Sequence, residues 1–308
     1  MSLLVVGTVA FDDIETPFGR AEKVVGGAAT YIALAASYYT RDIKIVSVVG
    51  DDFPQADLDD LRARGVDLAG LQVKQGEKSF FWAGKYHQNM NDRDTLDTQL
   101  NVLANFDPIL PPAYQEVDYL MLGNLTPAVQ LQVLDQLKTR PKLIALDTMN
   151  FWMNVAMDEL KTVLRRIDVL TINDEEARQL SGEHSLVKAA AVIHAMGPRF
   201  LIIKKGEHGA LLFADDQVFF APALPLAEVF DPTGAGDTFA GGFMGYLAST
   251  HDLSFDNFKR AVIYGSAMAS FCVEKFSTER LRELNDDLIM ERMLRFVQLV
   301  NFDAKLQA

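Results

Sequence analysis

The chain is short of the residues and segments that mark secreted and membrane proteins. Its 308 residues include one cysteine, Cys272, so no disulfide can form within the chain and a reducing compartment is expected. Cys272 lies in the apolar run 267–273, which predicts a buried and unreactive thiol. The first residues show no signal-peptide pattern, and no apolar run approaches the length of a membrane span. We therefore expect a cytoplasmic protein with no membrane partner.

Positive charge is also scarce. Lys and Arg number 29 against 42 Asp and Glu, which gives a formal net charge of −13. Such a surface repels an extended phosphate backbone, so we do not expect a nucleic-acid partner. The charge does not exclude a nucleotide, because Mg²⁺ and backbone amides at one helix N-terminus can hold a phosphate chain locally.

Two common kinds of site are missing from the sequence. The histidines have no metal-ligand spacing, so no structural zinc site is expected; they are His87, His184, His194, His208 and His251. A dinucleotide fingerprint is absent as well. Gly234-Ala235-Gly236 has Phe239 where the third glycine would stand, and it lies late in the chain instead of after the first strand. A nicotinamide-dependent dehydrogenase is therefore disfavoured.

What the chain does have is a regular alternation of strand and helix patterns. Short apolar runs predict buried strands at 3–7, 43–49, 119–122, 143–147, 169–172 and 201–204. Helical patterns lie between and after them, at 28–40, 57–64, 128–138, 155–166, 186–196, 235–249, 255–276 and 280 to about 301. This order predicts a three-layer α/β/α fold with a mostly parallel central sheet.

Two further predicted strands, 79–86 and 95–100, break this alternation. In the second, Leu96, Thr98 and Leu100 alternate with polar residues, as in a half-exposed strand. Together with residues after Gly7, these strands predict a small antiparallel sheet formed by about 8–25 and 75–102. Such a sheet could close over a ligand as a lid, pack against another subunit, or be an ordinary surface hairpin. We expect one domain over 1–308 with this lid inserted in it.

The richest segment for chemistry is 231–243, which reads Asp-Pro-Thr-Gly-Ala-Gly-Asp-Thr-Phe-Ala-Gly-Gly-Phe. Gly234 and Gly236 precede a helical pattern, and glycine lets backbone amides approach a ligand closely. Amides at a helix start form an anion site suited to phosphoryl transfer. Asp237 on the first turn could cap the helix, bind a metal or take a proton from a hydroxyl group. The residues alone leave these three roles open.

This segment resembles the C-terminal signature of the ribokinase (PfkB) family of carbohydrate kinases, with Pro232 inserted between the aspartate and the threonine. The resemblance implies that Asp237 is the catalytic base. It also implies that the amides of Gly234, Ala235 and Gly236 form an anion hole. For the other residues of this segment, the resemblance implies that Thr233 binds the nucleotide and that Asp231 contributes to a monovalent-cation site, such as one for K⁺.

The N-terminal part of the chain resembles the same family. Gly26-Gly27 opens a helix of small residues and is similar to the diglycine signature that lines the substrate pocket. Asp12 matches an acid that binds substrate hydroxyl groups, and Asp13 remains the alternative. Many members have an asparagine five residues after the first glycine, where this chain has Tyr31. The resemblance therefore implies a substrate pocket altered by Tyr31.

The nucleotide side also has counterparts in the family. Asn173 and Glu176 fit an Asn-x-x-Glu element that organises Mg²⁺ and phosphate through water, although the two residues alone could be a helix cap and a first-turn acid. Lys205, Gly206 and Gly209 resemble a turn at a strand end that approaches the nucleotide.

Taken together, the resemblance implies an ATP-dependent, Mg²⁺-requiring kinase that phosphorylates a hydroxyl group of a small sugar or sugar-like substrate. Two alternatives stay open. One is a nucleoside kinase, of adenosine type, on the same fold; the other is a ligand-sensing protein without activity. An exposed apolar face on the lid would favour a homodimer.

Overall fold

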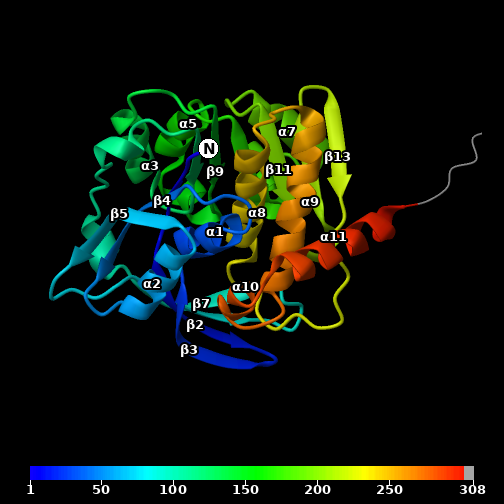
Figure 1. Cartoon of the computed structure of the whole chain (residues 1–308). Helices are drawn as coiled ribbons and strands as arrows, with labels where there is room; N and C mark the ends of the chain where they lie inside the picture. The colour runs from blue at the N-terminus through cyan, green and yellow to red at the C-terminus, as the bar shows by residue number, and fades with distance from the viewer. Residues whose placement is uncertain (302–308) are drawn as a thin grey trace, which may run out of the picture.

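A nine-stranded sheet forms the centre of the protein (Figure 1). The computed structural model describes residues 1–301. The strand order is β13-β12-β11-β10-β9-β8-β1-β4-β5. The seven strands from β11 to β5 in this order run parallel to one another, and β12 and β13 are added antiparallel at one edge. The strands are β1 (Leu3–Val6), β4 (Ile43–Gly50), β5 (Val66–Lys74), β8 (Tyr119–Leu122), β9 (Leu143–Asp147), β10 (Val169–Asn173), β11 (Phe200–Lys204), β12 (Ala210–Ala214) and β13 (Gln217–Ala221). The predicted mostly parallel α/β fold is confirmed.

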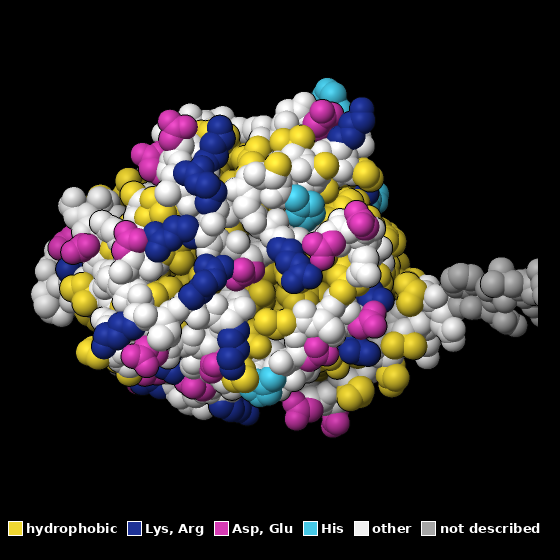
Figure 2. Space-filling view, turned by 90° about the horizontal axis from the view of Figure 1, so that it is seen from above, with side chains coloured by type: hydrophobic (Ala, Val, Ile, Leu, Met, Phe, Trp, Pro, Cys, Tyr) yellow, Lys and Arg dark blue, Asp and Glu magenta, His cyan; other side chains and the backbone are white. Residues whose placement is uncertain are grey.

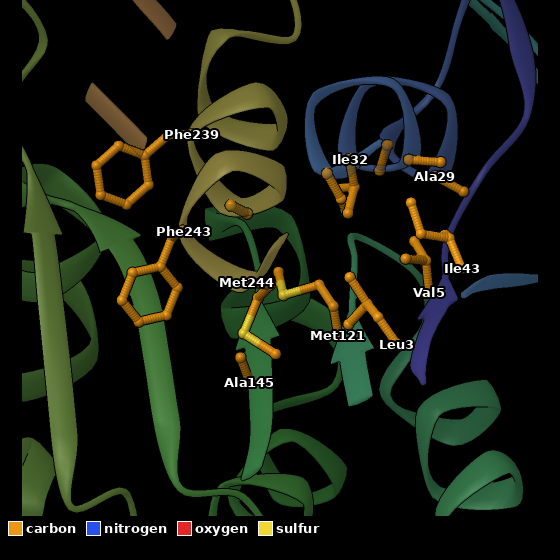
Figure 3. Packing of buried hydrophobic residues seen from close by; sticks show 14 of the residues in the cluster. Leu3, Val5, Ala29, Ile32, Ile43, Met121, Ala145, Phe239, Phe243 and Met244 are labelled. Carbon is orange, nitrogen blue, oxygen red and sulfur yellow. The ribbon is translucent and has the colours of Figure 1, made fainter. Parts of the chain in front are cut away.

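The buried strands supply two cores, because successive side chains of a strand point to opposite faces of the sheet. On one face, Val5 and Met121 pack against Ile32 and Met244, which come from two different helices (Figure 3). All four side chains are fully buried. The helices of this face are α1 (Ala28–Ala36), α2 (Gln55–Ala63), α8 (Ala235–Thr250) and α9 (Phe255–Cys272).

The opposite face of the sheet carries the second core. Here Leu4, Val6 and Leu146 pack against Val133 and Leu160. The helices of this face are α3 (Pro127–Gln136), α4 (Asn150–Val155), α5 (Met157–Leu164), α6 (Asp174–Ser181) and α7 (Leu186–His194). Burial on both faces explains why the central strands read as continuous apolar runs.

A second, four-stranded sheet forms the lid below the central sheet (Figure 1). Its strands are β2 (Ala10–Thr16), β3 (Gly19–Gly26), β6 (Phe81–Tyr86) and β7 (Arg93–Gln99), in the order β3-β2-β6-β7. The prediction of an antiparallel lid was wrong for the central pair, because β2 and β6 run parallel. Both leave the carboxyl edge of the central sheet, one after β1 and the other after β5, and therefore run in the same direction.

Several predicted helices end or break earlier than expected, among them the helix predicted at 28–40, which ends at Ala36. The helix predicted at 155–166 is two helices, α4 and α5, separated at Ala156, whose φ of −145° and ψ of 38° are not helical. The helix predicted to reach residue 276 ends at Cys272. Beyond it the Val273 carbonyl accepts a hydrogen bond from the Phe230 amide at 2.8 Å, and Ser277 has a φ of 55°.

The helix predicted from residue 280 is also divided. It consists of α10 (Glu279–Arg282) and α11 (Asp286–Val300). Asn285 begins the second helix, and its side chain accepts a hydrogen bond from the Leu288 amide at 2.9 Å. The short 3₁₀ helices are η1 (Asn101–Asn105), η2 (Pro112–Tyr114) and η3 (Gly206–His208).

The surface opposite the lid mixes the two signs of charge. Figure 2 views this face, and Lys and Arg side chains are interspersed there with Asp and Glu side chains.

Cys272 is buried, as predicted. No helix within residues 1–301 combines the length and the apolar character that a membrane crossing needs.

Candidate active site

Polar groups gather at the carboxyl edge of the central sheet, which is also the edge from which the lid projects (Figure 1). In open α/β sheets ligands bind outside the carboxyl ends of the strands. The groups found at this edge are Asp12 beside the diglycine, Asp147 at the end of β9, Asn173 at the end of β10, Lys204 at the end of β11 and the N-terminus of α8.

The N-terminus of α8 presents backbone amides to this edge. Gly234 has a φ of 73°, in the left-handed region that glycine adopts without strain. Of the three amides predicted to form the anion hole, that of Ala235 donates to the Pro232 carbonyl at 3.2 Å and so closes the turn, and that of Gly234 has no protein acceptor within residues 1–301. Within residues 1–301 the amides of Gly236 and Asp237 have no protein acceptor. The helix therefore offers two amide donors at its positive end, where an anion is stabilised.

Asp237 lies on the first turn of α8, beside these amides. Burial, reinforced by the nearby Asp147 carboxylate, raises the pKa of Asp237 to about 7, against the lowering effect of the Lys204 and Arg93 cations. A carboxylate with such a pKa can both accept and release a proton near neutral pH. This is the protonation behaviour that a general base needs.

Asp12 on β2 lies across from Asp237. Its side chain is 5% exposed, and a Cβ on Gly26 would overlap its carboxylate, so the acid and the diglycine are in contact. Burial raises the pKa of Asp12 to about 8, and the carboxylates of Asp231 and Asp237 add to the rise. Asp231 and Asp237 are therefore near enough to Asp12 to disfavour its charged form.

Asp13 does not share this position. It follows Asp12 on the same strand, so its side chain points to the opposite face of the lid sheet. There it accepts a hydrogen bond from the Lys23 amide at 2.6 Å and lies 3.7 Å from the Arg20 guanidinium. Between the two candidate acids, the structure favours Asp12 as the one that faces Asp237.

The diglycine begins α1 as the sequence predicted. Gly27 precedes the helix with a φ of 92°. Thr8 binds the first turn: its hydroxyl accepts from the Ala28 amide and its carbonyl accepts from the Ala29 amide, both at 2.9 Å. Thr8 therefore occupies the N-terminus of α1. The diglycine permits two close approaches, that of the Asp12 carboxylate to Gly26 and that of the Thr8 carbonyl to Gly27.

Tyr31 contacts Gly234, in the loop of residues 231–234 that precedes α8. Its side chain is 1% exposed and belongs to an apolar cluster with Phe271 and Cys272. A Cβ on Gly234 would overlap its ring. The contact that the structure gives Tyr31 is thus support of the loop, and the predicted contact with substrate stays a prediction.

Replacing Gly234 by alanine is expected to lower the turnover number by about tenfold to 10²-fold, because the new methyl group displaces either the Tyr31 ring or the turn that positions the amides of α8. Gly182→Ala is the matched control. Gly182 has a φ of 74°, but nothing lies within 4 Å of its added Cβ. Both variants carry a left-handed alanine, worth about 1–2 kcal/mol of stability. Steady-state kinetics and thermal melting of both variants measure the difference. Equal turnover in the two would contradict the view that the turn at Gly234 positions groups needed for the reaction.

Asn173 and Glu176 form a capping box at the start of α6. The Asn173 side chain accepts from the Glu176 amide at 2.7 Å, and Glu176 Oε2 accepts from the Asn173 amide at 2.8 Å. Glu176 is nevertheless 9% exposed and not a solvated first-turn acid. Burial, together with the Asp147 carboxylate, raises the pKa of Glu176 to about 7, while Lys204 lowers it. The capping box engages Oε2 of Glu176, and the other carboxylate oxygen accepts no hydrogen bond from residues 1–301.

The predicted nucleotide turn follows β11. The Lys205 amide donates to the Gly209 carbonyl at 2.7 Å, which closes the turn around η3. A Cβ on Gly206 would lie 2.9 Å from Oδ1 of Asn91, in the connection between β6 and β7. The tip of the lid therefore reaches the turn after β11, on the same side of the sheet as Asp237.

Thr233 and Asp231 bind the loop to its surroundings. The Thr233 hydroxyl donates to the hydroxyl of Tyr86 on β6 at 3.2 Å, which joins the loop to the lid. Asp231 is fully buried, and its two oxygens accept from the amides of Thr233 and Ser277, each at 2.8 Å. These bonds hold the loop in place, and the cation role of Asp231 stays a prediction.

Three charged residues of the site escaped the sequence reasoning: Asp147, Lys204 and Arg93. Asp147 and Lys204 are the last residues of predicted strands, so their place at the carboxyl edge was a usable signal. Arg93 lies on the lid strand β7, and only the folded structure brings its charge to Asp237 and Glu176.

Comparison with known proteins identifies the family. The model of the pfkB family carbohydrate kinases matches residues 4–283. A cytidine kinase of Thermococcus kodakarensis is 30% identical, over 79% of this chain and 87% of the relative. A nucleoside kinase of Methanothermobacter thermautotrophicus is 25% identical, over 90% of this chain and 91% of its own.

Solved structures share the fold. A putative ribokinase II from E. coli, in complex with ATP and Mg²⁺, superimposes with a TM-score of 0.79 at 19% identity, covering 97% of this chain and 99% of its own. A nucleoside kinase of Burkholderia thailandensis in complex with inosine gives a TM-score of 0.76 at 19% identity, covering 98% and 100%.

Proposed function

Because the chain belongs to the pfkB family of carbohydrate kinases, we propose that Asp237 is the base with which it phosphorylates a hydroxyl group of a small sugar or sugar-like substrate. Kinase activity follows from the family, and the alternative of an inactive ligand sensor is set aside. The observation that carries the assignment to Asp237 is its position: a carboxylate with a pKa near neutral pH stands beside two unengaged amides and opposite Asp12.

The reaction divides among a few groups of the chain. Asp12 binds the acceptor through its hydroxyl groups and directs one of them toward Asp237. Asp237 accepts the proton of that hydroxyl as its oxygen attacks the γ-phosphorus of ATP. The α8 amides of Gly236 and Asp237 donate hydrogen bonds to the phosphoryl oxygens, on which negative charge accumulates. The bond between the γ-phosphorus and ADP then breaks.

The nucleotide is proposed to lie along the turn after β11. Lys205, Gly206 and Gly209 form this turn, and Asn173 and Thr233 border the space between the turn and α8. Mg²⁺ supplies charge neutralisation of the triphosphate when it is bound. Within residues 1–301 no cluster of three acidic, histidine or cysteine side chains forms a direct metal site. One unengaged oxygen of Glu176 therefore fits a Mg²⁺ ion held through water.

A monovalent cation at Asp231 would act on the same loop. The carboxylate already accepts two amide hydrogen bonds, and its burial raises its pKa above the usual range. A K⁺ ion would therefore add charge compensation to a loop that protein bonds already hold. Titration of turnover with KCl against a sodium control tests this assignment.

A nucleoside kinase is the second candidate, because two of the similar relatives are a cytidine kinase and a nucleoside kinase. A nucleoside offers the same reacting group, a ribose hydroxyl, so the catalytic residues serve both candidates. ADP release with a panel of sugars, sugar acids, inositols and nucleosides tests the proposal. Acceptor-dependent release that is lost in Asp237→Asn supports it, and a higher kcat/KM for cytidine or inosine than for ribose selects the nucleoside. ATP binding without turnover on any acceptor would contradict it.

The lid offers a surface for association of two copies, which we also propose. Every residue of β7 is exposed, and Leu96 is 59% and Leu100 51% exposed. Static light scattering should give about twice the 34.2 kDa mass of the chain. Leu96→Lys with Leu100→Lys should give the single-chain mass. A wild-type monomer at all concentrations would contradict the proposal.

A further inference from the structure

Asp147 and Lys204 form a partly buried ion pair that the roles above do not use. Asp147 ends β9 and Lys204 ends β11, on either side of β10. Lys204 Nζ lies 2.5 Å from Asp147 Oδ2, and the hydroxyl of Thr171 on β10 donates to the same oxygen at 2.9 Å. The Lys204 side chain is 19% exposed and the Asp147 side chain 11%. Three adjacent strands thus hold one ammonium group in a fixed place.

Stability is a weak reason for such a pair. Removing two charges from water costs free energy that their attraction only partly returns, and apolar replacements of buried pairs are often neutral or stabilising. The ammonium group has three N–H donors. Within residues 1–301 it makes one hydrogen bond, the one to Asp147. The group is therefore oriented and still has donors to offer.

The position of Lys204 shows where these donors lie. Its Nζ is 3.0 Å from the point that a Cβ on Gly236 would occupy, so the ammonium group approaches the first turn of α8. The N-terminus of a helix carries partial positive charge and repels a cation. An anion between Lys204 and the unengaged amides of Gly236 and Asp237 would turn this repulsion into attraction on both sides.

We propose that Lys204 is a catalytic residue that donates hydrogen bonds to the oxygens of the transferring γ-phosphoryl group, and that Asp147 is the residue that positions it. This inference rests on the proposed function. Lys204 keeps its proton throughout: the bond from the acceptor oxygen to phosphorus forms, the bond from phosphorus to ADP breaks, and the hydroxyl proton goes to Asp237. The ammonium group balances the negative charge of the three equatorial oxygens.

Asp147 orients Lys204 and also acts on the base. The Asp147 carboxylate raises the pKa of Asp237, whereas the Lys204 cation lowers it. Arg93 adds a second lowering charge, and Asp12 is an acid on the lid side that interacts with Asp237. The ion pair therefore places the Lys204 ammonium group, a hydrogen-bond donor to phosphate, near Asp237. Because the Asp147 carboxylate opposes the effect of Lys204, the pKa of Asp237 still stays near neutrality.

Lys204→Met is expected to lower kcat by about 10²-fold, as the loss of one donor to a transition-state oxyanion does. Lys204→Arg should recover part of this loss, because a guanidinium keeps charge and donors. Asp147→Asn should lower kcat less than Lys204→Met. The matched control is Lys142→Met, which removes a lysine bound to Asp118 at 2.9 Å near the start of β9 and should keep wild-type kcat.

Two further measurements separate this role from a structural one. The double variant Lys204→Met, Asp147→Leu removes the whole pair, so it should melt near the wild-type temperature while kcat stays low. Wild-type turnover in this double variant, or in Lys204→Met, would overturn the proposal.

The second measurement is calorimetric binding, which needs no acceptor. Lys204→Met should bind a non-hydrolysable ATP analogue about tenfold more weakly and ADP as tightly as the wild type. Equal losses for both nucleotides would overturn a contact with the γ-phosphoryl group. Full kinase activity in Asp237→Asn, in contrast, would refute only the proposed base. The binding of the ATP analogue and of ADP to Lys204→Met would still test the contact with the γ-phosphoryl group.

Discussion

Replacing Asp237 by asparagine is expected to lower the turnover number by about 10²–10⁴-fold and to leave substrate KM nearly unchanged. Asparagine keeps the size of the side chain and removes its ability to accept the hydroxyl proton. The amides of α8 and the contacts of Asp12 remain, so binding should survive. Acceptor-dependent ADP release, with a circular dichroism spectrum and a thermal melt to show an intact fold, measures this.

The control for Asp237→Asn is Asp256→Asn. Asp256 also lies on the first turn of a helix, α9, and its side chain is 72% exposed beside Lys259. If Asp237 only stabilised its helix, both variants would lose a similar small amount of stability and neither would lose turnover. Turnover of Asp237→Asn within about threefold of wild type would refute the base, since a positioned base contributes far more.

The second large effect is expected at Asp12. Asp12→Ala removes the carboxyl group proposed to bind the acceptor and should lower kcat/KM by about 10²–10³-fold, mainly through KM, because each substrate hydroxyl group left buried without its partner costs about 1–3 kcal/mol. Steady-state kinetics at varied acceptor concentration measures the split.

Asp13→Ala provides the neighbouring control for this effect. Asp13 points away from the site, to the Lys23 amide and the Arg20 guanidinium. Its loss should change kcat/KM less than about threefold, as expected of a partly exposed pair. The reverse order, with Asp13→Ala the more damaging variant, would show that the acid of the site had been assigned to the wrong residue.

The sequence predicted the parts of this protein that depend on local pattern. The central strands such as β9 follow from runs of buried apolar residues, and Gly234 through Asp237 follow from glycine chemistry at a helix start and a family signature. The prediction missed whole elements, such as β5 and α6, and it also missed pairings between distant strands. Strands β12 and β13 form an antiparallel hairpin at the sheet edge, and β2 pairs parallel with β6 across some seventy residues of chain.

The site divides in the same way. Asp12 could be separated from Asp13 only when the strand direction was known, since adjacent residues face opposite sides of the lid. The burial of Tyr31 behind Gly234 follows from contact between α1 and α8, which no local pattern encodes. Lys204 and Asp147 are 57 residues apart in sequence, and only the order of β9, β10 and β11 brings them together.

The central claim is that Asp237 must lose its proton before phosphoryl transfer. Its pKa is raised to about 7, so the deprotonated, active form predominates above that pH and is lost below it. The decisive measurement is the single-turnover rate of phosphoryl transfer between pH 5 and 9, at saturating ATP and acceptor. The rate should fall about tenfold per pH unit below neutrality in the wild type. The residual rate of Asp237→Asn should lose the part of this decline that Asp237 causes and keep only the part due to Asp12 and Glu176, whose pKa values are also raised. The same acidic decline in both proteins, or a flat profile in the wild type, would contradict the claim.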